Sequence, residues 1–582
     1  MINQNKYRTH TCGELNISNV GESVRLAGWI NSVRNLGGLT FVTLRDNYGI
    51  TQLTLNDSDI KVPCKETVVS ISGKVVERES KNLKMPTGEI EVVVDTMETL
   101  GVCNNVLPFE IADAQNTKED LRLKYRYLDL RNEENHARIL LRSKLLQFIR
   151  TKMHSLGFNE VQTPILTSSS PEGARDFLVP SRLNPGQFYA LPQAPQQFKQ
   201  LLMISGFDKY FQIAPCFRDE DARADRSPGE FYQMDMEMSF ATQEDVMVVL
   251  EEVLSETIEH FTNAKVPTPF ERMKYNYAME NYCSDKPDLR NPLMVKDLSE
   301  LLSGSEFSVF KGKTIKGIVA HTGEKTRKFY DELTKYIVDN EGKGLCWFKV
   351  DENGELVGSA VKFLNETEIK GIKDTFEVKA GDSVFLIADD KTKAIRLANV
   401  LRNKLGTELD LIDKSAFRFV WIVDFPFYEY NEEEDKVEFS HNPFSMPQGE
   451  LEALNTKDPL TIEAYQYDLV LNGVEMLSGA VRNHNPEVMV KAFEIAGYDK
   501  EVVMSKFPAL FNAFQYGAPP HAGCAFGFDR LLMFICGTEI IRDVIAFPLN
   551  KNAQDLLMSA PNTVSEKQLK DVHIKLDIED KK

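Results

Sequence analysis

The sequence lacks the features that mark membrane and secreted proteins. No apolar run reaches the roughly eighteen residues that a bilayer-spanning helix needs. The N-terminus, Met-Ile-Asn-Gln-Asn-Lys, lacks the charged-then-apolar order of a secretion signal. The eight cysteines match no disulfide or zinc spacing, which predicts reduced thiols buried in cores. We therefore expect a soluble, cytoplasmic protein with no membrane partner.

Positive charge is also in short supply. The chain has 68 Lys and Arg against 87 Asp and Glu, which gives a formal charge of −19. Because phosphate backbones are bound by Lys and Arg, this balance argues against indiscriminate binding to nucleic acid, and no DNA partner is expected. A local basic face is still allowed between Lys118 and Lys152, although a solvated helix face explains the same pattern.

Five strand-like segments lie between Val24 and Val94, with turn signals at Gly37-Gly38 and Asn47-Tyr48-Gly49. Five short strands predict a small barrel, which is typical of oligonucleotide-binding (OB) folds that stack single-stranded bases on exposed aromatics. Phe41 is a candidate for such stacking, although strand aromatics more often lie in a core. At 582 residues and 66.1 kDa, the chain has room for roughly three domains.

A β-hairpin between Tyr210 and Phe240 is the most informative local pattern. Its second strand alternates Gln233, Asp235, Glu237 and Ser239 with methionines and aromatics. A period of two predicts one apolar face toward a core and one polar face. Arg218 ends the first strand, and the charged loop from Asp219 to Glu230 is longer than a reversal requires. A solvated hairpin shows the same alternation, but the long loop favours a ligand site.

Two other segments have clear helical patterns. Apolar residues at helical spacing predict a helix over Ala137–Leu156 that ends at Gly157, followed by a strand over Phe158–Ile165 that contains Pro164. Far downstream, Gly523–Leu532 places Arg530 at the start of an apolar helix.

These segments together carry a family resemblance. The helix, the proline-containing strand and the Phe-Arg-Asp-Glu hairpin resemble the first two signature motifs of class II aminoacyl-tRNA synthetases, and Gly523–Leu532 resembles the third. Ser-Pro-Glu-Gly-Ala-Arg-Asp-Phe-Leu-Val-Pro-Ser from Ser170 and Gln-Ala-Pro-Gln-Gln-Phe-Lys from Gln193 are similar to the bacterial-type aspartyl enzymes of that class. The resemblance covers nearly the whole chain.

The resemblance implies a multidomain α+β fold and a homodimer. We expect an OB-fold β-barrel that binds the anticodon at 1–104, a hinge at 105–134, and a class II catalytic domain with an antiparallel sheet and helices at 135–289 and 414–560. An inserted α/β domain of the GAD type is expected at 290–413, with helices at Phe329–Val338 and Ile395–Leu405. A C-terminal extension occupies 561–582.

Activation of an amino acid by ATP requires its carboxylate to approach the α-phosphorus in line while phosphate charge is neutralised. No protein nucleophile is needed, and we expect none. Arg218 is placed to bind the α-phosphate and stabilise the transition state. Arg530 resembles the family's γ-phosphate clamp, and Arg218, Arg530 and Glu475 are the candidate catalytic residues. The candidate ATP-binding residues are Arg218, Asp219, Glu220, Ser227, Phe231, Glu475, Gly527, Phe528, Asp529 and Arg530.

A second hairpin carries candidate metal ligands. Asn472-Gly473 is a strong two-residue turn signal, and with these residues central Val470 pairs with Glu475. Asp468 and Glu475 then share one face, and the resemblance implies that they hold Mg2+ with ATP; exposed acidic pairs are otherwise usually solvated. Arg482 has the wrong parity to share this face, which predicts a bulge at Ser478-Gly479.

Aspartate selection needs cations for the side-chain carboxylate and anions for the ammonium group. By resemblance, Arg482 and Lys199 hold the carboxylate, the arginine bidentately. Asp235 and Glu172 face the ammonium group. The candidate aspartate-binding residues are Glu172, Gln196, Lys199, Arg218, Gln233, Asp235, His441 and Arg482. The family more often has two histidines where this chain has His441-Asn442.

The expected activity is the joining of L-aspartate to tRNA(Asp) through an aspartyl-adenylate. The resemblance places Arg34, Phe41, Gln52, Arg78 and Glu91 against the anticodon. Leu36 resembles the residue found in the enzymes that do not also charge tRNA(Asn). The alternatives are an asparagine or lysine enzyme of the same group, a tRNA-independent amino-acid ligase, and a catalytically silent RNA-binding paralogue. The lysine enzyme is disfavoured because Arg482 and Lys199 would repel the lysine ammonium group.

Overall fold

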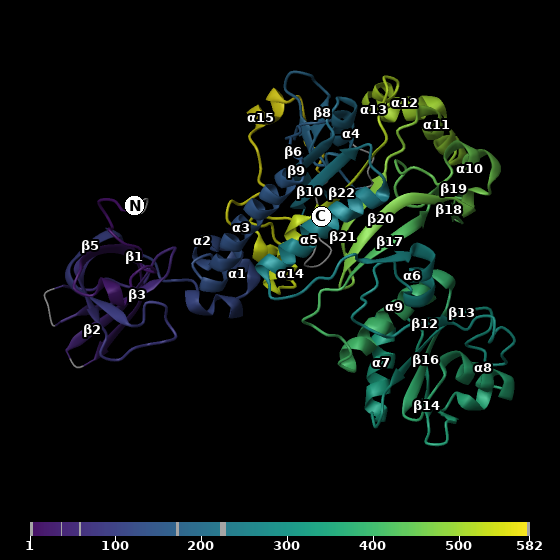
Figure 1. The fold of residues 1–582 in the computed structure, drawn as a ribbon, viewed down its shortest axis with the longest axis horizontal. Helices are drawn as coiled ribbons and strands as arrows, with labels where there is room; N and C mark the ends of the chain where they lie inside the picture. Colours follow the sequence, from purple (N-terminus) through teal and green to yellow (C-terminus); the bar gives the residue numbers. More distant parts are fainter. Residues whose placement is uncertain are drawn as a thin grey trace. The chain divides into compact units, whose positions relative to one another are not determined.

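The computed structural model describes residues 4–36, 38–56, 60–169, 174–220, 229–432 and 434–578. The chain forms two compact units, Met1–Glu110 and Ile111–Lys582, and Figure 1 labels many of their elements. No helix within these described ranges is long and apolar enough to cross a membrane.

The first unit is a closed barrel of five strands that pair in the order β1-β2-β3-β5-β4. The strands are β1 (Ser23–Leu36), β2 (Leu39–Arg45), β3 (Ile50–Leu55), β4 (Val68–Glu77) and β5 (Ile90–Gly101), and the short helix η1 (Ile17–Asn19) precedes them. Apolar residues at alternate positions, such as Val42, Leu44 and Leu53, fill the interior. The predicted five-stranded barrel is confirmed.

The second unit is built on an eight-stranded sheet in the order β11-β17-β20-β21-β22-β10-β9-β6. Its strands are β6 (Asn159–Glu160), β9 (Lys209–Phe217), β10 (Glu230–Ser239), β11 (Glu271–Lys274), β17 (Phe419–Pro426), β20 (Glu463–Leu471), β21 (Val474–Val481) and β22 (His521–Gly527). Neighbours are antiparallel except β6 with β9 and β11 with β17. Two small hairpins accompany the sheet, β7 (Leu178–Pro180) with β8 (Phe188–Ala190), and β18 (Tyr428–Asn431) with β19 (Lys436–Phe439).

Three helices cover one face of this sheet, namely α3 (Glu133–Ser155), α5 (Gln243–Phe261) and α14 (Phe528–Cys536). Met234, Met236 and Met238 of β10 lie in the core beneath them, as the alternation predicted. Because successive side chains of a strand point to opposite faces, the intervening residues Gln233, Asp235 and Glu237 face away from these helices.

Shorter helices surround the sheet. They are η2 (Ile111–Asn116), α1 (Glu119–Lys124), α2 (Arg126–Asp129), α4 (Gln196–Ile204), α6 (Tyr275–Tyr282), α10 (Glu450–Thr456), η5 (Pro459–Thr461), α11 (Pro486–Ile495), α12 (Lys500–Lys506), α13 (Pro508–Phe514), η6 (Ile541–Val544) and α15 (Glu566–Asp571). The first three occupy the expected hinge at 105–134. Arg122 Nε donates to the buried Asp129 at 2.9 Å, so this segment is folded rather than a bare linker.

Several local expectations need correction. The helix α3 begins at Glu133, earlier than its apolar pattern, because the Asn132 side chain accepts hydrogen bonds from the first free backbone N–H groups and so caps the helix. The predicted strand over 158–165 is reduced to β6, since Pro164 has no N–H to donate to a ladder. Cys64 is exposed, so the cysteines are not all core thiols.

The inserted segment forms its own five-stranded sheet in the order β12-β13-β16-β14-β15. Its elements are β12 (Val295–Asp297), β13 (Thr314–His321), α7 (Arg327–Asp339), β14 (Cys346–Val350), β15 (Leu356–Val357), η4 (Val361–Phe363), α8 (Glu366–Phe376), β16 (Asp382–Asp389) and α9 (Lys391–Glu408). Both helices predicted for this segment are present, as α7 and α9. We retain 290–413 as its proposed limits.

Candidate active site

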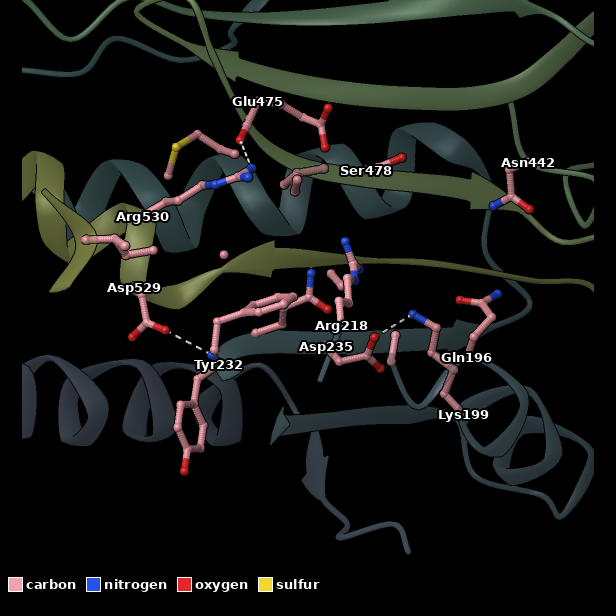
Figure 2. Close-up of a pocket in the computed structure, with 18 of the residues that line it drawn as sticks. Gln196, Lys199, Arg218, Tyr232, Asp235, Asn442, Glu475, Ser478, Asp529 and Arg530 are labelled. Carbon is pink, nitrogen blue, oxygen red and sulfur yellow. Dashed lines mark hydrogen bonds and ion pairs between the residues drawn. The ribbon is translucent and has the colours of Figure 1, made fainter. Parts of the chain in front are cut away.

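A pocket lies on the polar face of the large sheet, over β10, β21 and β22 (Figure 2). The predicted site residues that line it are Gln196, Lys199, Arg218, Phe231, Gln233, Asp235, Glu475, Arg482, Gly527, Asp529 and Arg530. These residues come from segments more than three hundred positions apart, and the antiparallel order of the strands brings them together.

Small residues on β22 leave room for the charged side chains beside them. Gly523 pairs with Glu237 across the ladder, and a Cβ on Gly523 would lie 2.1 Å from Glu237 Oε2. Ala525 is paired with Asp235 in the same way. Any larger residue at Gly523 would therefore displace the Glu237 carboxylate.

Four buried charges form what we call the floor: Lys199, Asp235 and Arg482 line the pocket, and Glu237 pairs with two of them. Lys199 Nζ lies 2.8 Å from Asp235 Oδ2 and 3.3 Å from Glu237 Oε2. Arg482 donates to Glu237 through Nε at 2.8 Å and through Nη2 at 3.1 Å. All four side chains are at most 2% exposed. Glu237 was not among the predicted site residues, although its alternation with Asp235 placed it on the correct face.

Burial and the neighbouring cations shift the two floor carboxylates in opposite directions. Burial raises the pKa of Glu237, but Arg482 and Lys199 outweigh it and hold that pKa below its usual value. For Asp235, burial exceeds the effect of Lys199, and its pKa is raised. Asp235 Oδ1 is buried and has no hydrogen-bond partner among the residues that the structure describes. That oxygen can accept a hydrogen bond from a bound cationic group.

The second predicted hairpin is β20–β21. Asn472 and Gly473 both have positive φ, and Val470 pairs with Glu475, as predicted. The register shifts next to this pair, because Leu469 already faces Leu477 and Met476 is an extra residue. The bulge therefore lies at Met476 and not at Ser478-Gly479, which are in regular register. The extra residue brings Glu475, Ser478 and Arg482 to one face.

Asp468 and Glu475 lie on the same face of this hairpin, where Asp468 is paired with Ser478 and Glu475 with Val470. Burial raises the pKa of Asp468 well above its usual value, and Glu475 adds to the shift. Asp468 Oδ1 is buried, and no described residue forms a hydrogen bond with it. A carboxylate pair with an unsatisfied oxygen fits a hard divalent cation such as Mg2+. Among the described residues no group of three or more His, Cys, Asp or Glu could hold a metal, so substrate oxygens would complete the coordination.

Two arginines bound the other end of the pocket. The Arg218 guanidinium lies over the Phe231 ring, 5.1 Å from its centroid. Arg530 Nη1 donates to the Glu475 carbonyl oxygen at 2.8 Å (Figure 2). Cationic guanidinium groups next to an aromatic face and a carboxylate pair suit a nucleoside triphosphate.

Asp529, one of the predicted ATP-binding residues, forms contacts that join neighbouring elements of the fold. Its carboxylate accepts a hydrogen bond from Arg142 and another from the Tyr232 backbone N–H, and Figure 2 shows the second of these. These contacts fasten α14 to β10 and leave the carboxylate engaged. Asp529 also lines the pocket next to Arg530, and its binding of ATP stays a prediction.

Other predicted residues lie away from the pocket lining. Phe528 is buried in the core under the sheet, and Asp219 and Glu220 are exposed beside the pocket. His441 packs against the rings of Tyr275 and Phe425, while its neighbour Asn442 lines the pocket. Glu172 and Ser227 lie outside the described residues.

The residues predicted to contact an anticodon gather on the outer face of the barrel. Arg34 on β1 is paired with Phe41 on β2, and Phe41 is half-buried with its neighbour Val42 turned inward. Gln52 Nε2 donates to Glu91 Oε2 at 2.7 Å, which joins β3 to β5 on this face. Arg78 follows directly after β4. This arrangement offers one aromatic platform with polar groups beside it.

Comparisons with known proteins agree with this architecture. The family described as tRNA synthetases class II (D, K and N) matches residues 118–551, and an OB-fold nucleic acid binding domain matches residues 24–100. A solved aspartyl tRNA synthetase from Entamoeba histolytica is similar in fold, with a TM-score of 0.57 at 20% identity over 92% of this chain and 90% of that one.

Curated relatives are similar over nearly their whole length. The aspartate–tRNA(Asp/Asn) ligase of Gluconobacter oxydans is 53% identical over 588 residues, which cover 98% of each protein. The aspartate–tRNA ligase of Streptomyces griseus is 52% identical over 581 residues, covering 98% of this chain and 97% of that protein. The chain therefore belongs to the class II tRNA synthetases of the D, K and N family.

Proposed function

We propose that this chain is an aspartate–tRNA ligase. In the first step an α-carboxylate oxygen of L-aspartate attacks the α-phosphorus of ATP, giving aspartyl-adenylate and pyrophosphate. In the second, the 3′-terminal ribose hydroxyl of tRNA(Asp) attacks the aspartyl carbonyl carbon and AMP leaves. In both steps a substrate supplies the nucleophile, so the protein needs only to bind and orient the substrates.

The observation that carries the assignment to aspartate is the buried floor of Lys199, Asp235, Glu237 and Arg482. Its four charges cancel, and Arg218 on the pocket wall adds one positive charge. Aspartate carries one net negative charge, whereas asparagine carries none and lysine has the opposite sign. Arg482 and Lys199 would hold the side-chain carboxylate, and Asp235 Oδ1 would accept from the α-ammonium group.

The other end of the pocket serves ATP. Arg218 binds the α-phosphate and stabilises the charge that develops there. Phe231 and Arg530 enclose the adenine ring between an aromatic face and a guanidinium group. Asp468 and Glu475 would hold Mg2+, which would neutralise phosphate charge.

The barrel binds the anticodon, with Phe41 stacking on one base and Arg34, Gln52, Arg78 and Glu91 beside it. We also propose that the chain works as a homodimer, as in the family it resembles. Sedimentation equilibrium of the full chain would give twice the monomer mass, and a monomer mass would contradict this part of the proposal.

ATP–pyrophosphate exchange driven by each of the twenty amino acids tests the assignment. We expect exchange with aspartate and none above background with asparagine or lysine. Exchange with asparagine or lysine but not with aspartate would overturn it. Exchange with no amino acid, in protein that is folded, would indicate a silent paralogue.

The tRNA partner is tested separately. Relatives of this chain are named both for tRNA(Asp) alone and for tRNA(Asp/Asn). Leu36, an exposed apolar residue at the end of β1, favours tRNA(Asp) alone. Aminoacylation of purified tRNA(Asp) and tRNA(Asn) with labelled aspartate decides the point, and comparable charging of both would extend the substrate range.

A further inference from the structure

Lys286 lies on the segment that joins the large sheet to the inserted domain, and its ammonium group reaches the carboxylate pair. Nζ is 3.3 Å from Glu475 Oε2 and 2.6 Å from Asp285 Oδ2. The Lys286 backbone N–H donates to Ser284 Oγ at 3.0 Å, which fixes the turn after α6. A cation is thus already present beside the residues assigned to metal binding.

The Asp468–Glu475 pair needs such a cation. Two carboxylates on one face of a hairpin repel each other, and Asp468 is buried with one oxygen that no described group satisfies. Among the described residues, Lys286 is the partner with which the Glu475 carboxylate forms an ion pair. The contact holds the Glu475 carboxylate and reduces the repulsion.

The inserted domain holds this segment from behind. Arg402, on α9, is fully buried and donates through Nη2 to the carbonyl oxygens of Asp288 at 2.9 Å and Asn291 at 2.6 Å. Its Nε donates to the carbonyl oxygen of Leu293 at 2.6 Å. Asn291 Nδ2 returns a hydrogen bond to the Arg402 carbonyl oxygen at 2.8 Å. One arginine of the insertion therefore fixes the chain that follows Lys286.

The opposite side of the same segment abuts the carboxylate hairpin. A Cβ added to Gly473, in the turn between β20 and β21, would come within 3.0 Å of Asp288 Cβ. Gly473 also has φ +81°, so the turn and the close approach both favour glycine. Residues 285–293 are packed between the inserted domain and the hairpin that carries Asp468 and Glu475.

We propose that Lys286 is a positioning residue for the metal and ATP site, whose ammonium group balances the Asp468–Glu475 pair until a divalent cation binds, and that the inserted domain keeps it there through Arg402. The inference deepens the proposed function and rests on it. It gives the inserted domain a role at the pocket without placing any of its residues on a substrate.

Competition between the ammonium group and the metal follows from this arrangement. Without Lys286 the carboxylates carry more uncompensated negative charge, so a free divalent cation binds more tightly. The same change removes an ion pair that stabilises the metal-free protein. A side chain that merely fills space would alter stability but would leave the metal affinity unchanged.

The test measures Mn2+ binding to the full chain by electron paramagnetic resonance, with no ATP, amino acid or tRNA. For Lys286→Met we expect about fivefold tighter Mn2+ binding, the size expected for one partly exposed charge. Its melting temperature should fall in EDTA and recover with Mg2+. Lys286→Arg, which keeps the charge, should retain the affinity of the unmodified chain.

Lys274→Met is the matched control, because Lys274 forms an ion pair of 2.9 Å with Asp424, outside the carboxylate pair. It should leave Mn2+ affinity unchanged. Arg402→Lys should shift the affinity in the same direction as Lys286→Met and add nothing to it in the double variant. Unchanged affinity in Lys286→Met, or fully additive effects, would overturn the proposal. Neither result bears on which amino acid is activated, so the two proposals fail separately.

Discussion

Arg482 donates two parallel hydrogen bonds to Glu237, a residue 245 positions earlier in the chain, and both side chains are almost completely buried. The pair uses Nε and Nη2, while Nη1 donates to no other described residue and Arg482 lines the pocket. Glu237 thus orients the guanidinium group before any substrate arrives. Pre-orientation reduces the ordering that binding would otherwise require.

We expect Arg482→Leu to abolish aspartate activation while ATP still binds. The substitution removes the bidentate partner of the substrate carboxylate and leaves Glu237 with only Lys199. Loss of one partner of a buried charge pair typically costs about 2–5 kcal/mol, or roughly 30- to 5,000-fold in kcat/KM. Pyrophosphate exchange measures the loss, and calorimetry measures ATP binding. Unchanged aspartate kinetics would contradict the proposed pocket.

A double-mutant cycle measures the coupling between the same two residues. Glu237→Gln and Arg482→Leu should each lower the free energy of unfolding, since each leaves a buried charge poorly paired. The double variant should be more stable than the sum predicts, by ~1–3 kcal/mol for residues in one network. Denaturant titrations of the four proteins give the value. Additive effects would mean that the two side chains are not coupled.

Asp468→Asn should stabilise the metal-free protein and inactivate it. The pKa of Asp468 is raised, chiefly by burial, so its ionisation costs stability as pH rises above the usual carboxyl range. The amide removes that cost, and we expect a gain of ~1–3 kcal/mol at neutral pH in EDTA. The gain should shrink at low pH, where the wild-type carboxyl is protonated. A less stable variant under these conditions would contradict the assignment of Asp468 as an unsatisfied carboxylate.

His521 should make the protein sensitive to mild acid. Burial lowers its pKa to about 4, and its ring nitrogens lie 2.8 Å from the Pro519 carbonyl oxygen and 3.2 Å from Gln200 Oε1. Because the unfolded chain takes up this proton near pH 6.5, stability is complete above that pH and falls between about pH 6.5 and 4. The loss amounts to ~3 kcal/mol by linkage. His521→Gln should reduce the change in the free energy of unfolding between about pH 6.5 and 4. An unchanged dependence on pH would contradict the role given to His521.

Phe41→Ala should separate tRNA binding from amino-acid activation. Loss of one stacking aromatic typically costs ~1–3 kcal/mol, so the KM for tRNA should rise roughly 5- to 150-fold. Pyrophosphate exchange should be unaffected, because the described residues that line the pocket proposed for ATP all belong to the second unit. An unchanged KM for tRNA would remove Phe41 from the proposed anticodon surface.

Local patterns predicted much of the fold. Alternation assigned the faces of β10 correctly, and Asn472-Gly473 set the turn and the pairing of Val470 with Glu475. Both depend on neighbouring residues alone. The predicted five-stranded barrel is likewise confirmed, and the turn signals at Gly37-Gly38 and Asn47-Tyr48-Gly49 separate its first three strands in the sequence.

The features that could not be predicted from the sequence depend on contacts between distant segments. The need for a bulge was inferred from the position of Arg482, but its place at Met476 is set by how β20 and β22 pair on either side of β21. Glu237 lay on the predicted face, yet only the fold brings Arg482 to it. Lys286 had no local signal, since its partner Glu475 arrives from far downstream.

The extra residue at Met476 governs how this stretch can change in length. A strand turns each successive side chain to the other side, so adding or removing one residue between Glu475 and Arg482 would point one of them away from the substrate. Adding or removing two would keep both on the same side and alter only their spacing. Insertions or deletions of two residues should therefore be tolerated better here than those of one residue, because the alternation of the strand decides the outcome and not any single side chain.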